Sequence, residues 1–391
     1  MRTTSGTLLA LSLASFGVGC SCDENLGADA GPSLDAAEPP DAVGMNDDAA
    51  RADAGTDAAS SADAASDAAT DGGGDAGTVF HYDCGAFSEA SGWVVREGYR
   101  AVVVADVADG LSEPVAVTFA EGAYGGMLFV VSSGSDTVHR VDVATGTTTA
   151  FTTGAAWGAT APSVLTTIMW DATGVLDGAL YVGDQGGDGD ADSVLYRVAS
   201  DGTASVATRA PGAGLDDIYA LTFSPPGSAY PPGLYLAGDT DGSGVDWGVF
   251  DGTTVSAFSE VTGVEGASFD PTGLYGGSLW ASRPGGGGYA GDASITPISA
   301  AGVAGTPIFM GDTGIHAVTF SERGTFGARM YAASWSTGSL FEIAPEGTST
   351  TLATGLSLTN YDGNILAVSS DGEVMFVADR LANRVVCIEP I

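Results

Sequence analysis

One motif recurs six times in this sequence, and its period constrains the fold more than any other feature. Each copy is a short run of small or apolar residues that ends at an anchor residue. The anchors are Phe119, Trp170, Phe223, Phe269, Phe320 and Val368. Consecutive anchors lie 51, 53, 46, 51 and 48 residues apart, which is the length of one four-stranded propeller blade with its loops. The period therefore predicts an all-β fold, a six-bladed β-propeller.

The segments between the anchors support this prediction. A Gly-rich turn and a second apolar run follow each anchor, and helical periodicity is nearly absent. The last repeat runs out of chain after its third strand. Residues 101–107, which precede the first blade, are the expected donor of the missing outer strand. Such a closure would remove the open edge of the last sheet.

The N-terminus has the pattern of a signal peptide over residues 1–19. Arg2 supplies the positive charge, residues 8–18 are apolar but too few to span a bilayer as a helix, and Gly19 precedes Cys20. This pattern predicts lipidation of Cys20 and a membrane attachment through the lipid alone. The protein would then be anchored at the outer membrane or lie in the periplasm or outside the cell. Gly17 stands where lipoproteins prefer a branched aliphatic residue, so ordinary secretion stays open as the alternative.

Residues 20–78 differ in composition from the rest of the chain. They are mostly Ala, Asp, Gly, Ser, Thr and Pro, and no aromatic residue occurs between Phe16 and Phe80. Such a stretch buries too little apolar area to offset its ordering entropy. We therefore expect a disordered acidic tether over residues 20–78 and a folded domain over residues 79–391.

Charge and cysteine content narrow the classes of partner. The formal net charge is -37 and there is no lysine, which excludes nucleic acid, because binding to phosphates requires a basic patch. Of the four cysteines, Cys84 and Cys387 lie near the two ends of the predicted domain. An exported protein meets an oxidising compartment, so we expect these two to form a disulfide; two unpaired buried thiols are the alternative. We expect a monomer.

The last repeat carries a family resemblance. Val377–Asp379 and Ala382–Val385 are similar to an NHL repeat, and the pattern from Pro114 to Ile391 resembles the gluconolactonase and senescence-marker propellers. The resemblance implies a divalent cation, usually calcium, held by Glu, Asn and Asp side chains where inner strands begin, beside an acid that activates water. For Asp379 and Arg384 the simpler interpretation is that they hold a blade turn by hydrogen bonds.

The repeat register locates candidate site residues at one mouth of the propeller, where inner strands begin. Four residues before the anchors stand Val115, Thr166, Tyr219, Glu265, His316 and Asn364, and two further back in three blades stand Glu113, Asp217 and Asp362. The resemblance implies metal ligation by Glu265, Asn364 and Asp362. Glu265, His316 and Asp217 are the catalytic candidates, and Thr166, Tyr219 and Glu113 are ligand-binding candidates. The alternative is that these groups bond neighbouring blades and channel water.

Two further candidates lie in loops. Asp188, Asp190 and Asp192, which follow Asp184, have the alternating carboxylates that converge on one calcium ion, but Ala199 stands at the twelfth position where an EF-hand has Glu. A solvated acidic loop is the alternative. Trp335 is a candidate for stacking on a sugar or peptide.

Three functions remain open from the sequence. The first is a tethered binding propeller whose acidic, calcium-holding mouth takes a protein, peptide or polysaccharide ligand. The second is a calcium-dependent hydrolase of lactones or related esters, and the third is a structural adhesion module. Only the hydrolase loses turnover when Glu265 or His316 becomes alanine and the fold survives.

Overall fold

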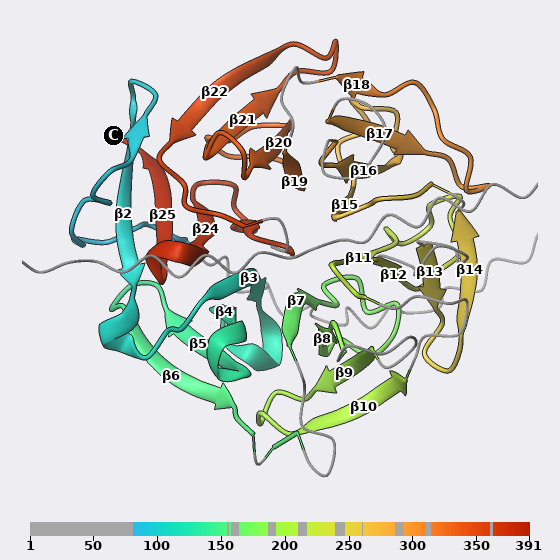
Figure 1. The fold of residues 1–391 in the computed structure, drawn as a ribbon, viewed down its shortest axis with the longest axis horizontal. Helices are drawn as coiled ribbons and strands as arrows, with labels where there is room; N and C mark the ends of the chain where they lie inside the picture. The colour runs from blue at the N-terminus through green and yellow to red at the C-terminus, as the bar shows by residue number, and fades with distance from the viewer. Residues whose placement is uncertain are drawn as a thin grey trace, which may run out of the picture. The chain divides into compact units, whose positions relative to one another are not determined.

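The strands form six sheets arranged around a common axis as the blades of a propeller (Figure 1). The computed structural model describes residues 81–391 apart from residues 155, 158–163, 187–192, 210–216, 239–246, 260, 286–292, 310–313 and 360–362. The predicted signal peptide, Cys20, the tether and the aspartates Asp188, Asp190, Asp192 and Asp362 lie outside the described residues. No helix in the described part has the length and hydrophobicity needed to cross a membrane. The all-β propeller prediction is confirmed.

The first three blades follow the chain in order, from the inner to the outer strand. Blade one consists of β3 (Pro114–Ala120), β4 (Met127–Ser132), β5 (Thr137–Asp142) and β6 (Thr147–Thr152). Blade two consists of β7 (Leu165–Trp170), β8 (Leu180–Asp184), β9 (Val194–Val198) and β10 (Ala204–Arg209). Blade three consists of β11 (Ala220–Phe223), β12 (Leu234–Ala237), β13 (Trp247–Phe250) and β14 (Val255–Ser259). Every neighbouring pair is antiparallel, as a meander requires.

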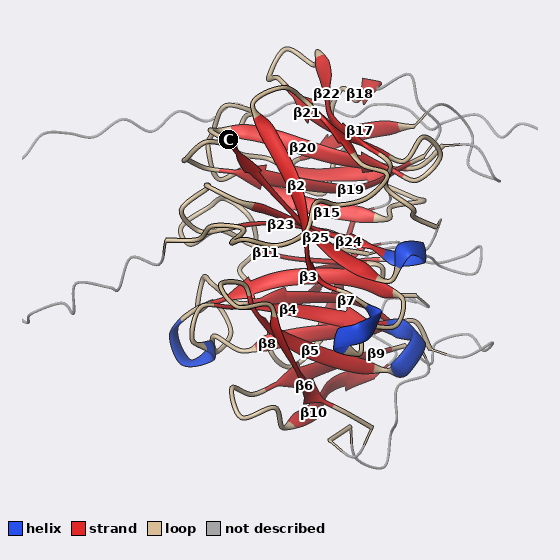
Figure 2. Ribbon diagram, turned by 90° about the vertical axis from the view of Figure 1, so that its left-hand side faces the viewer, coloured by secondary structure: helices blue, strands red, loops and turns tan. Residues whose placement is uncertain are grey.

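The remaining blades repeat this pattern until the last one. Blade four consists of β15 (Gly266–Phe269), β16 (Leu279–Arg283), β17 (Ser294–Ile298) and β18 (Ile308–Phe309). Blade five consists of β19 (Ile315–Ser321), β20 (Arg329–Ser334), β21 (Ser339–Ile343) and β22 (Ser349–Thr354). Blade six contains β23 (Leu366–Val368), β24 (Met375–Asp379) and β25 (Arg384–Pro390). Short 3-10 helices occur at η1 (Val107–Asp109), η2 (Gly122–Tyr124), η3 (Ser133–Ser135) and η4 (Arg380–Ala382), and Figure 2 shows such helices on both faces of the disc.

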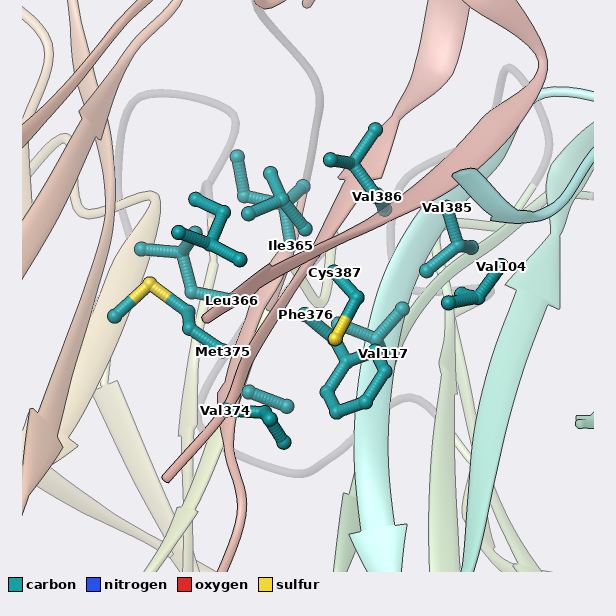
Figure 3. Close-up of a cluster of buried hydrophobic side chains, with 14 of the residues drawn as sticks. Val104, Val117, Ile365, Leu366, Val374, Met375, Phe376, Val385, Val386 and Cys387 are labelled. Atoms are coloured by element: carbon teal, nitrogen blue, oxygen red, sulfur yellow. The ribbon is translucent and has the colours of Figure 1, made fainter. Parts of the chain in front are cut away.

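The ring is closed by a strand from the other end of the domain. β2 (Tyr99–Ala105) pairs antiparallel with β25 and becomes the outer strand of blade six, with Val102 opposite Cys387. Next to this pairing a disulfide joins Cys84 to Cys387, whose Cα atoms are 5.7 Å apart. Val104 of β2, Val117 of β3 and Phe376 of β24 belong to one buried cluster at the closure (Figure 3). The predicted strand donor and the predicted pairing of the two cysteines are both present.

A second N-terminal strand was not expected. β1 (Val94–Val95) pairs with β22 and adds a fifth strand to blade five. The segment before β2 thus covers two outer strand edges. β1 covers the edge of β22, and Glu89 forms an antiparallel bridge with Val102 on the outer edge of β2. Unpaired strand edges are sites of unwanted association, so this segment protects two of them.

The anchors of the sequence repeat hold neighbouring blades together. The four phenylalanine anchors each pack against an aromatic ring of the preceding blade, with ring centroids 4.8 to 5.7 Å apart. The pairs are Phe119 with Phe376, Phe223 with Tyr181, Phe269 with Tyr235, and Phe320 with Tyr275. All four geometries are edge-to-face, which the ring quadrupoles favour. The repeat is therefore a pattern of contacts between blades.

A buried tyrosine in three of the turns after the inner strand makes a further connection. The Tyr230 hydroxyl donates to the carbonyl of Ile298, at 2.5 Å, and accepts from the amide of Leu279, at 2.9 Å. Both partners belong to the next blade. The equivalent pairs are Val198 with Leu180 for Tyr124, and Ile343 with Met330 for Tyr275. Blade five has Phe326 in this turn, so the connection is absent there.

We expect Tyr230→Phe to lower the free energy of unfolding by about 2 kcal/mol, because the change leaves a buried amide and a buried carbonyl of blade four without their shared partner. Urea denaturation measures this loss. Tyr99→Phe is the matched control, since within the described residues the Tyr99 hydroxyl has only a 3.4 Å contact from Arg96, and its loss should stay below about 0.5 kcal/mol. Equal losses in the two variants would contradict the proposed role of the hydroxyl.

His139 of β5 predicts a pH dependence of stability. The side chain is 6% exposed, its two ring nitrogens have no hydrogen-bond partner among the described residues, and burial lowers the pKa of the imidazole. The unfolded chain binds a proton at His139 as the pH falls below about 6.5, whereas the folded chain resists it. The contribution of His139 to the free energy of unfolding is therefore fully present above that pH. As the pH falls below it, this contribution is lost, by at most about 1.4 kcal/mol per pH unit. Urea denaturation at pH 7.5 and 5.5 should show a smaller loss of unfolding free energy in His139→Leu than in the wild type. His81→Gln is the control, because this histidine is largely exposed, and it should behave as wild type. Identical losses in all three proteins would refute the assignment.

Candidate functional site

The candidate residues of the register lie at the beginnings of the inner strands. Thr166 is in β7 and His316 is in β19. Tyr219 and Glu265 immediately precede β11 and β15, and Asn364 lies two residues before β23. All five side chains are buried. Contacts between consecutive inner strands run around the whole ring and close between β23 and β3, so these residues surround the central axis.

Glu265 and His316 are in contact across the interface between blades four and five. Oε2 of Glu265 lies directly against Nδ1 of His316, and the two side chains are 8% and 0% exposed. The backbone holds both residues in place: the amide of Glu265 donates to the carbonyl of Ser282, at 3.1 Å, and the Ser282 hydroxyl donates to the carbonyl of His316. Gly266 permits this approach, since a Cβ atom there would lie 2.1 Å from the His316 carbonyl oxygen.

The other ring nitrogen of His316, Nε2, does not contact Glu265. Nε2 is buried and has no hydrogen-bond partner among the described residues. A carboxylate at Nδ1 favours the tautomer with the proton on Nδ1, which leaves Nε2 as an acceptor, a base or a metal ligand. The Trp335 ring lies edge-on to the imidazole, with centroids 6.0 Å apart, and is 38% exposed. Trp335 thus connects the buried pair to the surface.

Asn364 has a different environment from the one that the resemblance implies. The side-chain Nδ2 donates to the carbonyl of Leu221 in blade three, at 2.7 Å. The backbone carbonyl of Asn364 accepts from the amide of Val117 in blade one, at 2.9 Å. A Cβ atom on the preceding Gly363 would lie 2.3 Å from the Thr166 carbonyl oxygen and 2.6 Å from that of Tyr219. The start of blade six is therefore packed against blades one, two and three, and the Asn364 amide serves as a connection between blades.

Two other candidates form a pair. The Tyr219 hydroxyl donates to Oδ2 of Asp217, at 2.5 Å, and Nε2 of Gln185 donates to the same oxygen, at 3.3 Å. The Thr166 hydroxyl instead donates to the backbone carbonyl of Ile218. These contacts link blades two and three beside the mouth.

Glu113 is engaged with blade six. Its carboxylate lies 2.9 Å from Nη2 of Arg380, and its amide donates to Oδ1 of Asn383, at 2.7 Å. The side chain is 48% exposed. The structure therefore brings together Glu265 with His316 and Asp217 with Tyr219, and it directs Thr166, Asn364 and Glu113 to other partners.

The interpretation of Asp379 and Arg384 as a structural pair is confirmed. The Asp379 carboxylate is fully buried and accepts from Nε of Arg384, at 2.8 Å, from Nε1 of Trp93, at 3.0 Å, and from the amide of Ser357, at 2.6 Å. These bonds fix the turns around the last blade. Asp184, which ends the second strand of blade two, likewise accepts from the amides of Val164 and Gly186.

The described residues alone do not fit a calcium ion. No three or more His, Cys, Asp or Glu side chains of the described part are close enough to share a metal. The central pair offers one carboxylate and one imidazole, whereas calcium takes about six to eight oxygen ligands, and the Asn364 amide is bonded to Leu221. A calcium site at this mouth would require oxygens from residues outside the described part, for which Asp362 is the candidate in the sequence.

The register did not reveal a second row of polar residues. The second strands end at Ser132, Asp184, Ala237, Arg283, Ser334 and Asp379, so this position is polar in five blades. Arg283 directly follows Ser282, whose hydroxyl donates to the His316 carbonyl, and the Arg283 Nε is buried without a hydrogen-bond partner among the described residues. Counting from the ends of the second strands would have located this row.

Comparison with known proteins bears on the fold. No protein-family model matches the chain, and no curated protein matches it by sequence. Among solved structures, a gluconolactonase from Xanthomonas campestris has a TM-score of 0.55 at 12% identity, over 76% of this chain and 91% of that one. The PQQ domain of a pyranose dehydrogenase from Coprinopsis cinerea has a TM-score of 0.52 at 13% identity, over 78% of this chain and 98% of that one.

A third similar structure is a binding protein and not an enzyme by name. An auxiliary nutrient binding protein from Bacteroides ovatus has a TM-score of 0.51 at 14% identity, over 72% of this chain and 70% of that one. At these identities the likeness concerns the fold and not the chemistry. The chain is a six-bladed β-propeller with the same fold as the gluconolactonase.

Proposed function

We propose that this protein is a ligand-binding propeller that takes a polar small molecule of the carbohydrate or sugar-lactone class at the beginnings of its inner strands. The observation that carries the proposal is the Glu265–His316 pair, in which Nε2 of the imidazole is buried without a partner among the described residues. A buried polar atom without a hydrogen bond costs about 1–3 kcal/mol, so a ligand that bonds to Nε2 recovers this energy.

The ligand class follows from the residues beside the pair and from the similar structures. A carboxylate and an imidazole bond well to sugar hydroxyls, and an exposed tryptophan such as Trp335 offers an apolar face for a sugar ring. The gluconolactonase, the pyranose dehydrogenase domain and the nutrient binding protein supply a common theme of sugars and nutrients. Binding requires only the pair and its surroundings.

Hydrolysis of a lactone is the second candidate, and the same pair favours it. The Glu265 carboxylate at Nδ1 orients the imidazole, and Nε2 would then remove a proton from a water molecule that attacks the lactone carbonyl. The breaking ester bond would release a hydroxyl and a carboxylate. This function demands more than binding, since the oxyanion formed in the attack needs its own hydrogen-bond donors.

Calorimetric titration of the full chain with gluconolactone and glucose tests the proposal, with base consumption at constant pH recording hydrolysis. We expect saturable binding that weakens at least tenfold in Glu265→Gln and in His316→Gln. Glu342→Gln is the matched control, because Glu342 lies in β21 and pairs with Arg96; it should bind as wild type. Binding without turnover supports the binding protein, and turnover that His316→Gln abolishes supports the hydrolase. Absence of binding to both compounds, or equal binding in all variants, would overturn the proposal.

A further inference from the structure

A pocket lies at the other end of the inner strands. It has a volume of about 400 Å³ and is formed by the ends of β3, β7, β19 and β23 and the turns that follow them. His316 is near the start of β19 and Ser321 is its last residue, so about 17 Å of extended strand separates the pocket from the Glu265–His316 pair. The pocket is therefore a site distinct from the one described above.

Several aromatic and apolar side chains line the pocket. Phe119, Met169, Trp170 and Phe320 contribute to its wall. Nε1 of Trp170 donates to the carbonyl of Gly178, at 3.1 Å, which fixes the orientation of the indole. Met169 and Trp170 are only partly buried, although both stand at the end of an inner strand, so part of their apolar surface faces the opening. A wall of this kind suits a flat apolar group.

The rim of the pocket holds two opposite charges on either side of Ser370. Nε of Arg323 donates to the Ser370 carbonyl, at 2.8 Å, and the Ser370 hydroxyl donates to Oε1 of Glu121. The Tyr82 hydroxyl donates to the same oxygen of Glu121, at 3.3 Å. These bonds orient Arg323, Ser370 and Glu121. They leave the terminal nitrogens of Arg323 and Oε2 of Glu121 without a partner in the described part of the chain.

Arg323 is in the minority of described arginines that make no ion pair in the described part of the chain, together with Arg140 and Arg283. The chain has 12 basic residues against 49 acidic ones, and six of its described arginines are in ion pairs with carboxylates, namely Arg96, Arg100, Arg197, Arg329, Arg380 and Arg384. Arg323 makes no ion pair with Glu121 or with its neighbour Glu322 among the described contacts. A guanidinium held at a pocket rim through its Nε, with its two terminal nitrogens unpaired in the described part of the chain, is suited to a carboxylate.

We propose that this pocket binds a zwitterion with an apolar side chain, namely an apolar amino acid or a short peptide of such residues. The ligand carboxylate would bond to the terminal nitrogens of Arg323, its ammonium group to Oε2 of Glu121, and its side chain would lie against Trp170 and Phe320. A neutral sugar would leave both rim charges unmatched, and a simple carboxylic acid would leave the Glu121 carboxylate beside its own. The zwitterion satisfies both charges and the apolar wall together.

Calorimetric titration of the full chain with L-phenylalanine tests this proposal. Two analogues identify the groups recognised without any change to the protein: N-acetylphenylalanine lacks the ammonium group and phenylalaninamide lacks the carboxylate. We expect each analogue to bind at least tenfold more weakly than the amino acid, and Arg323→Gln and Glu121→Gln to weaken the amino acid by a similar factor. Glu265→Gln, at the opposite end of the strands, should bind it as wild type, which separates this site from the one proposed above.

The contrary outcomes are distinct. No heat with L-phenylalanine, L-leucine or diphenylalanine would overturn the proposal. Equal affinities for the amino acid and its two analogues would also overturn it, because the rim charges would then take no part. If Arg323→Gln disturbs the fold, as its thermal melt would show, the analogue series on the unaltered protein still decides the question.

Discussion

Replacing both Cys84 and Cys387 with alanine is expected to lower the free energy of unfolding by about 5 kcal/mol in the chain-entropy account of disulfides. The bond joins residues 303 positions apart and ties the start of the domain to the strand that closes the ring. Without it, the unfolded chain gains the freedom of a very long loop, while the folded protein keeps the pairing of β2 with β25. Urea denaturation of the double variant and the wild type measures the difference.

Reduction of the wild type provides the control for this prediction. A reducing agent should destabilise the wild type to the level of the double variant and leave the variant unchanged. Both sulfur atoms belong to residues that are fully buried, so reduction should become rapid only under conditions that open blade six. A loss below about 1 kcal/mol in the double variant would mean that the strand pairing alone holds the ring closed.

Substitution of His316 with leucine is expected to cost about 3 kcal/mol of stability, because it leaves the buried Glu265 carboxylate facing an apolar side chain. Glu265→Gln is the matched comparison, since its amide keeps a neutral polar group of the same size beside Nδ1 of His316, and it should cost less than about 1.5 kcal/mol. Thermal and urea unfolding of the two variants give both values. A smaller loss in His316→Leu than in Glu265→Gln would show that the carboxylate is not held by the imidazole.

The period of the anchors was sufficient to predict the blades, because four of the six anchors make the same aromatic contact with the preceding blade. The missing outer strand of the last repeat also had a local signal, an apolar run before blade one. β1 had no local signal in the sequence, because Val94–Val95 is too short to show an alternation. Its pairing with β22 depends on the path of the chain before the closing strand β2. The tyrosine connections between blades likewise depend on the next blade's backbone.

The candidate site was predicted only in part for a similar reason. Counting from the anchors placed Glu265 and His316 at one level of neighbouring blades, and the structure brings them into contact. The same count did not reveal that the Asn364 amide reaches Leu221 in blade three, because the direction of a side chain before a strand depends on the local turn. The pocket at the strand ends was missed because its rim residues, such as Arg323 and Ser370, lie in turns without a recurring pattern, although anchors such as Phe320 form part of its wall.

Binding of a ligand at the Glu265–His316 pair is tested most directly by ¹⁵N NMR of the histidine rings. The chain has three histidines, so selective labelling gives few signals, and His316→Gln assigns one of them. We expect titration with gluconolactone or glucose to shift the Nε2 signal of His316, to leave that of buried His139 unchanged, and to have at least a tenfold weaker effect in Glu265→Gln. A His316 signal that neither compound moves in the folded protein would contradict the claim and leave the pair as a connection between blades four and five.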